Sequence, residues 1–188
     1  MDFPPDQLVL TRTKNLQETL KFIQAIPFES EYQNWHHRIT QFLSKKTKQW
    51  ELFYLQSKHG VIYGFCLISN GKYRLKKWNK KFQSHPQINH FIDLNSSSHF
   101  AYFYIHPKNR GQGLGTIALE KIKEQLKQNG KNYLYGFTRY SQIIPLYQRN
   151  GAKIIHQETN ATEIRTYYYW ELKKIRNRQS PESENCLE

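Results

Sequence analysis

The feature that most constrains this chain is a glycine-rich segment between an expected strand and an expected helix. Gly111, Gly113 and Gly115 alternate within the run Arg110-Gly-Gln-Gly-Leu-Gly-Thr116. The first turn of a helix has four backbone N–H groups without helical partners, and the positive end of the helix dipole lies beside them. Because glycine has no Cβ, the backbone here can approach an anion closely. The segment therefore predicts a phosphate or pyrophosphate site, with a simple connecting turn as the alternative interpretation.

The glycine spacing separates this segment from two common phosphate-binding motifs. A Walker A loop needs Gly-Lys-Ser/Thr, whereas Gly115 is followed by Thr116 and Ile117. Glycines at 111, 113 and 115 also differ from the Gly-x-Gly-x-x-Gly spacing of dinucleotide-binding loops. Both of those classes are excluded.

Hydrophobic periodicity predicts an ordered series of elements around this segment. Asn15 and Glu18 have the spacing of a capping box, and Gly130 is expected just beyond the end of the third helix. Strands are expected at 6–12, 50–57, 61–69, 99–106, 132–138, 153–157 and 166–172, and helices from 15 to 26, from Ser30, at 114–129 and at 141–150. The order is βααββ, an excursion, then βαβαββ. It predicts an α+β fold with a mixed, mostly antiparallel sheet of six to seven strands, about four flanking helices and a parallel pair at the phosphate site.

One domain is expected over residues 1–175. Residues 71–98 break the periodic pattern, and the stretch 72–98 holds six Lys or Arg against one Asp. We expect a basic excursion outside the core that covers the edge of the sheet. Residues 176–188 are charged and rich in Ser and Glu, so we expect a disordered tail there.

Composition narrows the cellular setting. No run approaches the roughly 20 apolar residues of a membrane-spanning helix, and the N-terminus lacks a basic region followed by an apolar stretch. We therefore expect a cytoplasmic protein without membrane contact. Cys66 and Cys186 form no disulfide framework, and no histidine has metal-ligand spacing, so no metal is expected. The formal charge of +13 favours an anionic partner, such as RNA or the ribosome, or else a solvated lysine-rich surface.

Two motifs together resemble a known family. Phe103-Tyr-Ile-His-Pro-Lys-Asn-Arg-Gly-Gln-Gly-Leu-Gly-Thr116 is similar to the central motif of the GCN5-related N-acetyltransferases, in which a hydrophobic strand leads to Arg/Gln-x-x-Gly-x-Gly/Ala at the start of a helix. About 30 residues later, Leu146-Tyr-Gln-Arg-Asn-Gly-Ala152 is similar to that family's Leu-Tyr-x-x-x-Gly-Phe. The resemblance covers roughly residues 99–157.

The resemblance implies a role for each matching residue. Backbone groups of Phe103 and Ile105 would pair with the pantetheine arm of acetyl-CoA, and Tyr147 would donate a proton to the leaving thiolate. The diphosphate would be held by the amides of Gly111, Gln112, Gly113, Leu114, Gly115 and Thr116, with positive charge added by Arg110.

Several residues are candidates for the base that takes the proton of the attacking amine. Many members of the family carry Glu or Asp on the strand before the glycine-rich loop, but here that strand reads His99-Phe-Ala-Tyr-Phe-Tyr-Ile-His106. His106 is the first candidate for a catalytic proton relay, with Tyr104 and His99 as alternatives. Glu29 and Glu31 are candidates to attract a cationic acceptor.

The leading hypothesis is an acetyl-CoA-dependent N-acyltransferase that moves an acyl group onto a primary amine by direct attack. An amine attacking a thioester needs a neutral nucleophile, donors for the developing oxyanion and a stabilised leaving thiolate. No covalent enzyme intermediate is needed, so Cys66 has no catalytic role. The alternative, from another class, is a nucleic-acid-binding or CoA-sensing module without turnover, with Tyr73 and Trp78 stacking on bases. Turnover of acetyl-CoA discriminates between the two.

Overall fold

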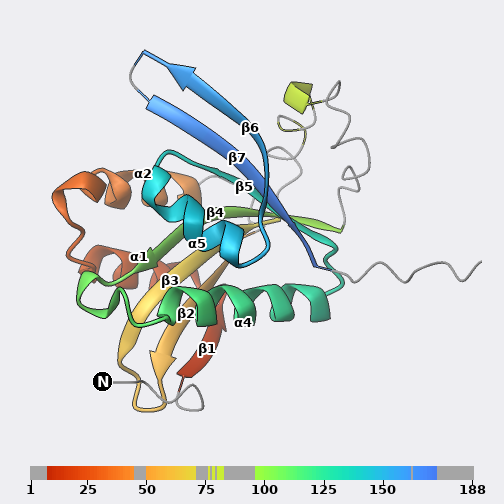
Figure 1. Cartoon of the computed structure of the whole chain (residues 1–188). Helices are drawn as coiled ribbons and strands as arrows, with labels where there is room; N and C mark the ends of the chain where they lie inside the picture. The colour runs from red at the N-terminus through yellow and green to blue at the C-terminus, as the bar shows by residue number, and fades with distance from the viewer. Residues whose placement is uncertain are drawn as a thin grey trace, which may run out of the picture.

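The computed structural model describes residues 8–44, 50–70, 76, 78, 80–82, 96–161 and 163–172. Its elements follow the expected order (Figure 1). The strands are β1 (Leu8–Thr13), β2 (Trp50–Ser57), β3 (Ile62–Ser69), β4 (Ser97–Ile105), β5 (Tyr133–Thr138), β6 (Lys153–Asn160) and β7 (Glu163–Glu171). The α-helices are α1 (Leu16–Ala25), α2 (Trp35–Ser44), α4 (Leu114–Gln128) and α5 (Ile144–Arg149), and short 3₁₀ turns are η2 (Ser30–Tyr32), η3 (Pro107–Asn109) and η4 (Ser141–Ile143).

The strands form one seven-stranded sheet in the order β1-β2-β3-β4-β5-β7-β6. Only β4 and β5 pair in parallel among the described strands; the other neighbours are antiparallel. The predicted α+β class and its parallel pair are therefore confirmed. The second helical connection, from β5 to β6, does not create a parallel pair because β7 lies between them.

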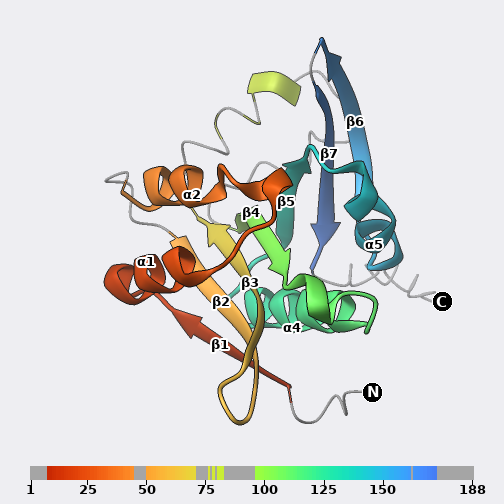
Figure 2. The same ribbon diagram turned by 90° about the vertical axis from the view of Figure 1, so that its left-hand side faces the viewer.

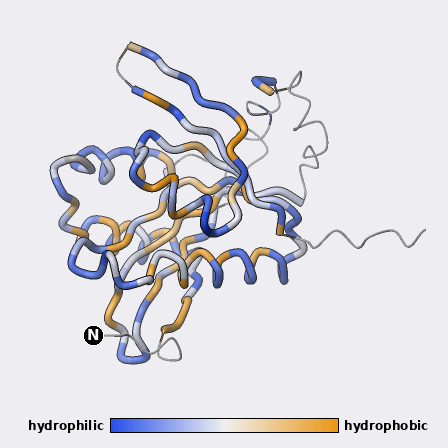
Figure 3. The backbone as a smooth tube through the Cα atoms, in the orientation of Figure 1, coloured by the Kyte–Doolittle hydropathy of each residue, from blue (hydrophilic) through white to orange (hydrophobic). Residues whose placement is uncertain are grey.

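Helices cover both faces of the sheet (Figure 2). On one face α1 and α2 bury Ile23, Ile39 and Leu43 against strand residues such as Leu52 and Leu67. On the other face α4 buries Leu119, Ile122 and Leu126. Hydrophobic and hydrophilic residues alternate along α4 (Figure 3), as an amphipathic helix requires.

The predicted cap of α1 forms, with one change of partner. The Asn15 side chain accepts hydrogen bonds from the amides of Gln17 and Glu18. The Glu18 carboxylate, however, accepts from the hydroxyl of Thr13 at 3.2 Å and not from the Asn15 amide, whose acceptor is the same Thr13 hydroxyl. The predicted C-terminal glycine of α4 is also present. Gly130, just beyond the end of this helix, has a φ of +75°.

The basic excursion differs from its prediction where it is described. Trp78 and Phe82 are 7% and 5% exposed and pack against Tyr135, Tyr167 and Tyr169 of β5 and β7. The expectation that residues 71–98 contribute nothing to the core is therefore wrong for these two aromatics. Ser97 and Ser98 also belong to β4, which begins two residues earlier than expected. The predicted tail, 176–188, lies outside the described residues.

Candidate functional site

The site begins where the two parallel strands separate. β4 and β5 pair from Ser97↔Tyr133 to Phe100↔Gly136, yet β4 continues to Ile105 and β5 to Thr138. At the same point the register between β3 and β4 shifts, so that Ala101 has no partner on β3. A bulge of this kind bends a strand and increases its twist. It accounts for the opening between β4 and β5.

Backbone groups of β4 are exposed along this opening. The amide of His106 donates to the carbonyl of Tyr63 at 2.8 Å, which fixes the hydrogen-bonding phase of the antiparallel β3–β4 ladder. By the alternation of such a ladder, Phe103 and Ile105 direct their N–H and C=O groups away from β3. The Ile105 carbonyl accordingly accepts from Nε of Arg110 at 2.9 Å. These are the two residues predicted to pair with a pantetheine arm.

The glycine-rich segment leads from β4 into α4. Gly113 is the N-cap of α4 with a φ of +76°, a left-handed conformation that favours glycine. Among the described residues, the amides at positions 111–115 donate to no other backbone group, whereas the Thr116 amide donates to the Gly113 carbonyl at 3.0 Å. Five of the six predicted amides are thus available to an anion at a helix N-terminus.

Gly115 lies where α4 contacts α5. A Cβ at this position would lie 3.0 Å from Cδ2 of Leu146 on α5. Asn150 joins the same two helices: its Nδ2 donates to the Leu146 carbonyl at 2.8 Å and contacts Oγ1 of Thr116 at 3.4 Å. Asn150 is buried and was not singled out from the sequence, although it lies inside the Leu-Tyr-x-x-x-Gly motif. The contact between α4 and α5 therefore places Tyr147 beside the glycine-rich loop.

Arg110 is held by the loop that follows α1. Its Nη1 lies 2.8 Å from Oε1 of Glu29, and the hydroxyl of Tyr104 donates to the same carboxylate at 3.2 Å. Burial and the Glu29 charge raise the pKa of Tyr104 to about 12. The sequence predicted Arg110 as a phosphate ligand and Glu29 as an acceptor ligand. The structure pairs the two across 81 positions.

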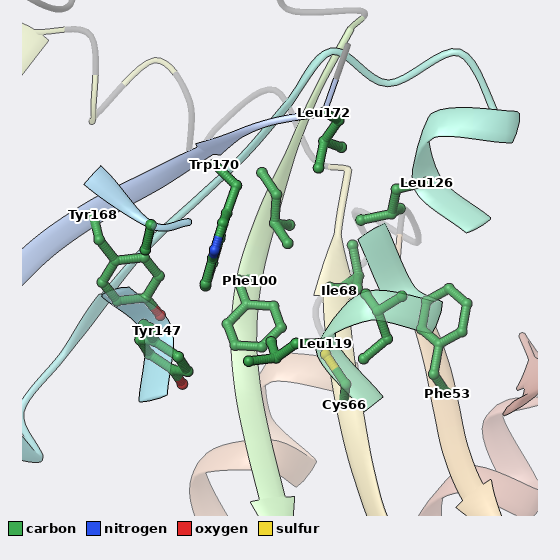
Figure 4. Packing of buried hydrophobic residues seen from close by; sticks show 13 residues of the cluster. Phe53, Cys66, Ile68, Phe100, Leu119, Leu126, Tyr147, Tyr168, Trp170 and Leu172 are labelled. Carbon is green, nitrogen blue, oxygen red and sulfur yellow. The ribbon is translucent and has the colours of Figure 1, made fainter. Parts of the chain in front are cut away.

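Tyr147 lies in the core of the site, 4% exposed. Its ring packs on Tyr168 with centroids 4.8 Å apart, and Figure 4 shows the two hydroxyl groups on the same side of the cluster. Burial raises the pKa of the Tyr147 phenol well above its ordinary value, and a hydrogen bond with Tyr168 lowers it only in part. Tyr147 therefore stays protonated at neutral pH and remains a hydrogen-bond donor.

A cavity of about 710 Å³ joins these features. Of the predicted site residues it is lined by Phe103, Ile105, Arg110, Gly111, Gly113, Leu114, Gly115, Thr116 and Tyr147, but not by Gln112 or His106. Gln112 is exposed and its side chain donates to the Lys108 carbonyl. His99 of β4 does line the cavity, and its ring packs near the aromatic rings of Tyr135 and Phe137. His106 lies one residue beyond the end of β4, where it begins the turn η3.

Within the described residues no cluster of three or more His, Cys, Asp or Glu side chains is arranged to hold a metal ion. The described helices include none with the length and apolar character required to cross a bilayer. Cys66 is buried, 1% exposed, as expected for a core residue.

Comparisons with known proteins agree with this geometry. The model of the Acetyltransferase (GNAT) family matches residues 20–152. A search of curated proteins gives no match.

Among solved structures, the chain is similar to a GNAT-family acetyltransferase from Desulfovibrio desulfuricans (12% identity, TM-score 0.62, covering 88% of this chain and 99% of that chain). It is also similar to the ribosomal-protein-S18-alanine N-acetyltransferase from Escherichia coli (16%, 0.58, 92% and 99%) and to a chimeric spermidine N-acetyltransferase from Vibrio cholerae (13%, 0.58, 88% and 96%). The structural similarity shows a shared fold, and the family model, which covers more than half of the chain, establishes the relationship. The chain belongs to the GNAT acetyltransferase family.

Proposed function

We propose that the protein transfers an acetyl group from acetyl-CoA to a primary amine by direct attack. The observation that carries this proposal is that one cavity contains both unpaired amides at the start of α4 and the buried hydroxyl of Tyr147. The first suits a diphosphate, and the second suits a sulfur atom that becomes a thiolate. The opening between β4 and β5 connects the two.

The donor is held by main-chain groups. The amides at 111–115 bind the diphosphate, while Phe103 and Ile105 pair with the amide groups of the pantetheine arm. Arg110 acts mainly as an anchor of the loop, because Glu29 and the Ile105 carbonyl already occupy its guanidinium. Main-chain recognition of this kind depends on the path of the backbone and tolerates many side chains.

The transfer step needs a proton acceptor and a donor to sulfur. The ammonium group of the acceptor first loses a proton to His99, the one imidazole among the described lining residues. The amine nitrogen then bonds to the acetyl carbon and the carbon–sulfur bond breaks, so that the sulfur leaves as a thiolate. The nitrogen loses its second proton as the amide forms, and that proton passes to the thiolate to give free CoA. Tyr147 stabilises that thiolate by a hydrogen bond. Because burial raises the pKa of its phenol, the hydroxyl keeps its own proton while it donates this hydrogen bond.

The acceptor is an amine, and the similar structures bear names with unlike acceptors, a ribosomal protein and spermidine. The first test is calorimetry with acetyl-CoA, followed by measurement of free CoA released across a library of amines. Binding together with amine-dependent CoA release supports the proposal. Binding without release with any amine would leave a CoA sensor, and absence of binding would overturn the proposal.

Tyr147→Phe tests the role of the hydroxyl. Removing one donor to a developing anion is expected to lower kcat by about 10² while acetyl-CoA binding is retained. Tyr169→Phe on β7 is the matched control, since its ring is buried in a cluster outside the cavity. Equal loss of kcat in both variants would remove Tyr147 from the mechanism.

A further inference from the structure

One part of the cavity has aromatic walls from three segments. Trp35 and Phe42 come from α2, Tyr102 from β4, and Tyr140 from the turn after β5. The rings of Trp35 and Tyr102 lie 5.3 Å apart and those of Phe42 and Tyr102 6.0 Å apart. Nε1 of Trp35 donates to the Tyr140 hydroxyl at 3.0 Å, which fixes the position of the indole. These rings touch one another edge to face and form one rigid apolar wall, and the part of the cavity beside this wall is called the aromatic slot. The slot is suited to an apolar group.

One cation lies within this slot. Trp35, Arg38 and Phe42 are separated by three and four positions, so they share one face of α2. All three line the cavity, and Arg38 is exposed at its rim between the two aromatic residues. The helix therefore presents a guanidinium to whatever occupies the slot.

The charged residues among the described lining of the cavity are all positive. Four arginines and no Asp or Glu occur among its described lining residues. Arg110 pairs with Glu29, and Arg139 pairs with Glu163, a carboxylate that it shares with Arg165. Arg38 and Arg149 form no ion pair with any described residue.

The two remaining arginines lie on different elements of the cavity. Arg149 ends α5, which contacts the start of α4 through Leu146 and Asn150, and so belongs to the side where the diphosphate is proposed. Arg38 belongs to α2 and the aromatic slot. One unpaired cation is thus left for the donor and another for the acceptor.

We infer that the acceptor is a small amine whose apolar body carries a carboxylate at the end remote from the amine. This inference rests on the proposed function. The body lies against the rings of Trp35 and Tyr102, the carboxylate pairs with Arg38, and the amine points toward the opening between β4 and β5. Guanidinium and carboxylate match as a bidentate pair. A polycation such as spermidine is disfavoured because the slot offers it a positive charge and no described carboxylate.

The experiment compares amines that differ in one group. The probes are 4-(2-aminoethyl)benzoate, phenethylamine, which lacks the carboxylate, and spermidine. We expect kcat/KM to be highest for 4-(2-aminoethyl)benzoate, by about tenfold over phenethylamine and mainly through a lower KM. Equal use of the two aromatic amines, or preference for spermidine, would overturn the inference.

Variants separate the role of Arg38 from general charge. Arg38→Gln is expected to remove the tenfold advantage while phenethylamine is used as before, and Arg38→Lys to restore part of it. Lys127→Gln, an equal charge change outside the cavity on α4, is expected to change neither substrate. A loss in Arg38→Gln that is equal for both amines contradicts the inference.

A binding measurement keeps the inference apart from the transfer proposal. Calorimetry of 4-(2-aminoethyl)benzoate is performed on the protein saturated with CoA, so that no reaction is required. Binding that weakens about tenfold in Arg38→Gln supports the acceptor inference even if no amine releases CoA, in which case the transfer proposal alone fails. Absence of binding, or binding indifferent to Arg38, overturns the inference whatever the turnover.

Discussion

The two halves of the β4–β5 pair differ in how the two strands are joined: one half is hydrogen-bonded and the other is open. From Ser97 to Phe100, β4 is hydrogen-bonded to β5 and its side chains are buried. Beyond Ala101, β4 leaves β5 and its residues line a cavity. In the closed half the N–H and C=O groups of β4 that face β5 are hydrogen-bonded to that strand. In the open half the corresponding groups are left for a ligand.

The comparison shows that one irregular residue divides a paired stretch of backbone from a stretch left open to a ligand. Without the bulge, Phe100, Tyr102 and Tyr104 would share a face. Instead Phe100 and Phe103 pack on the side of α4 and α5, while Tyr102 and Tyr104 pack on the side of α1 and α2. The predictions below test how far the two halves are independent.

The sharpest contrast is between two phenylalanines of β4. Phe100→Ala removes a side chain that is 2% exposed and packs on Trp170 and Tyr147, and we expect a loss of about 3–5 kcal/mol in the free energy of unfolding. Phe103→Ala, in the open half, is only partly buried and should cost less than half as much while it weakens acetyl-CoA binding. Urea denaturation and calorimetry measure both; equal losses of stability would break the comparison.

Gly136 tests how tightly the closed half is packed. A Cβ here would lie 2.8 Å from the Tyr168 hydroxyl and 2.9 Å from the Phe100 carbonyl, so Gly136→Ala is expected to cost about 1–3 kcal/mol. Adding Tyr168→Phe removes the first clash and leaves the second. The stability loss of the double variant should therefore be smaller than the sum of the two single losses. Simple additivity would show that the contact with the hydroxyl does not matter.

The smallest effect is expected from Tyr104 at high pH. Its pKa is raised to about 12 in the folded protein, by burial and by Glu29, against about 10 in the unfolded chain. The folded state therefore retains a proton that the unfolded state loses, and the stability that this group contributes falls as pH rises from about 10 through about 12. Tyr104→Phe should show a shallower decline over this window in urea midpoints. An unchanged slope would contradict the prediction.

The sequence predicted those features that depend on neighbouring residues. Asn15 caps α1, Gly130 ends α4, and the glycine-rich segment joins β4 to α4 as expected. Each follows from local rules: a side chain bonds an amide two or three positions away, or a glycine takes a positive φ.

Contacts between distant residues were not predictable in the same way. The pairing of Arg110 with Glu29 depends on where the loop after α1 lies, and the burial of Trp78 and Phe82 depends on how a basic, aperiodic segment meets β5 and β7. The bulge at Ala101 has no sequence signal, because an alanine fits a regular strand equally well. His99 on β4 lines the cavity, whereas His106, beyond the last residue of that strand, does not. An anionic partner for the +13 charge stays a prediction.

The bulge also affects how this protein can change over evolution. Since β4 supplies the donor side with main-chain atoms and the slot with side chains, an insertion or deletion in it would disturb both at once. Helix α2 contributes Trp35, Arg38 and Phe42 to the slot alone, so substitutions there can retune the choice of acceptor while the chemistry is left intact. New specificities should therefore arise mostly by point changes on this helix.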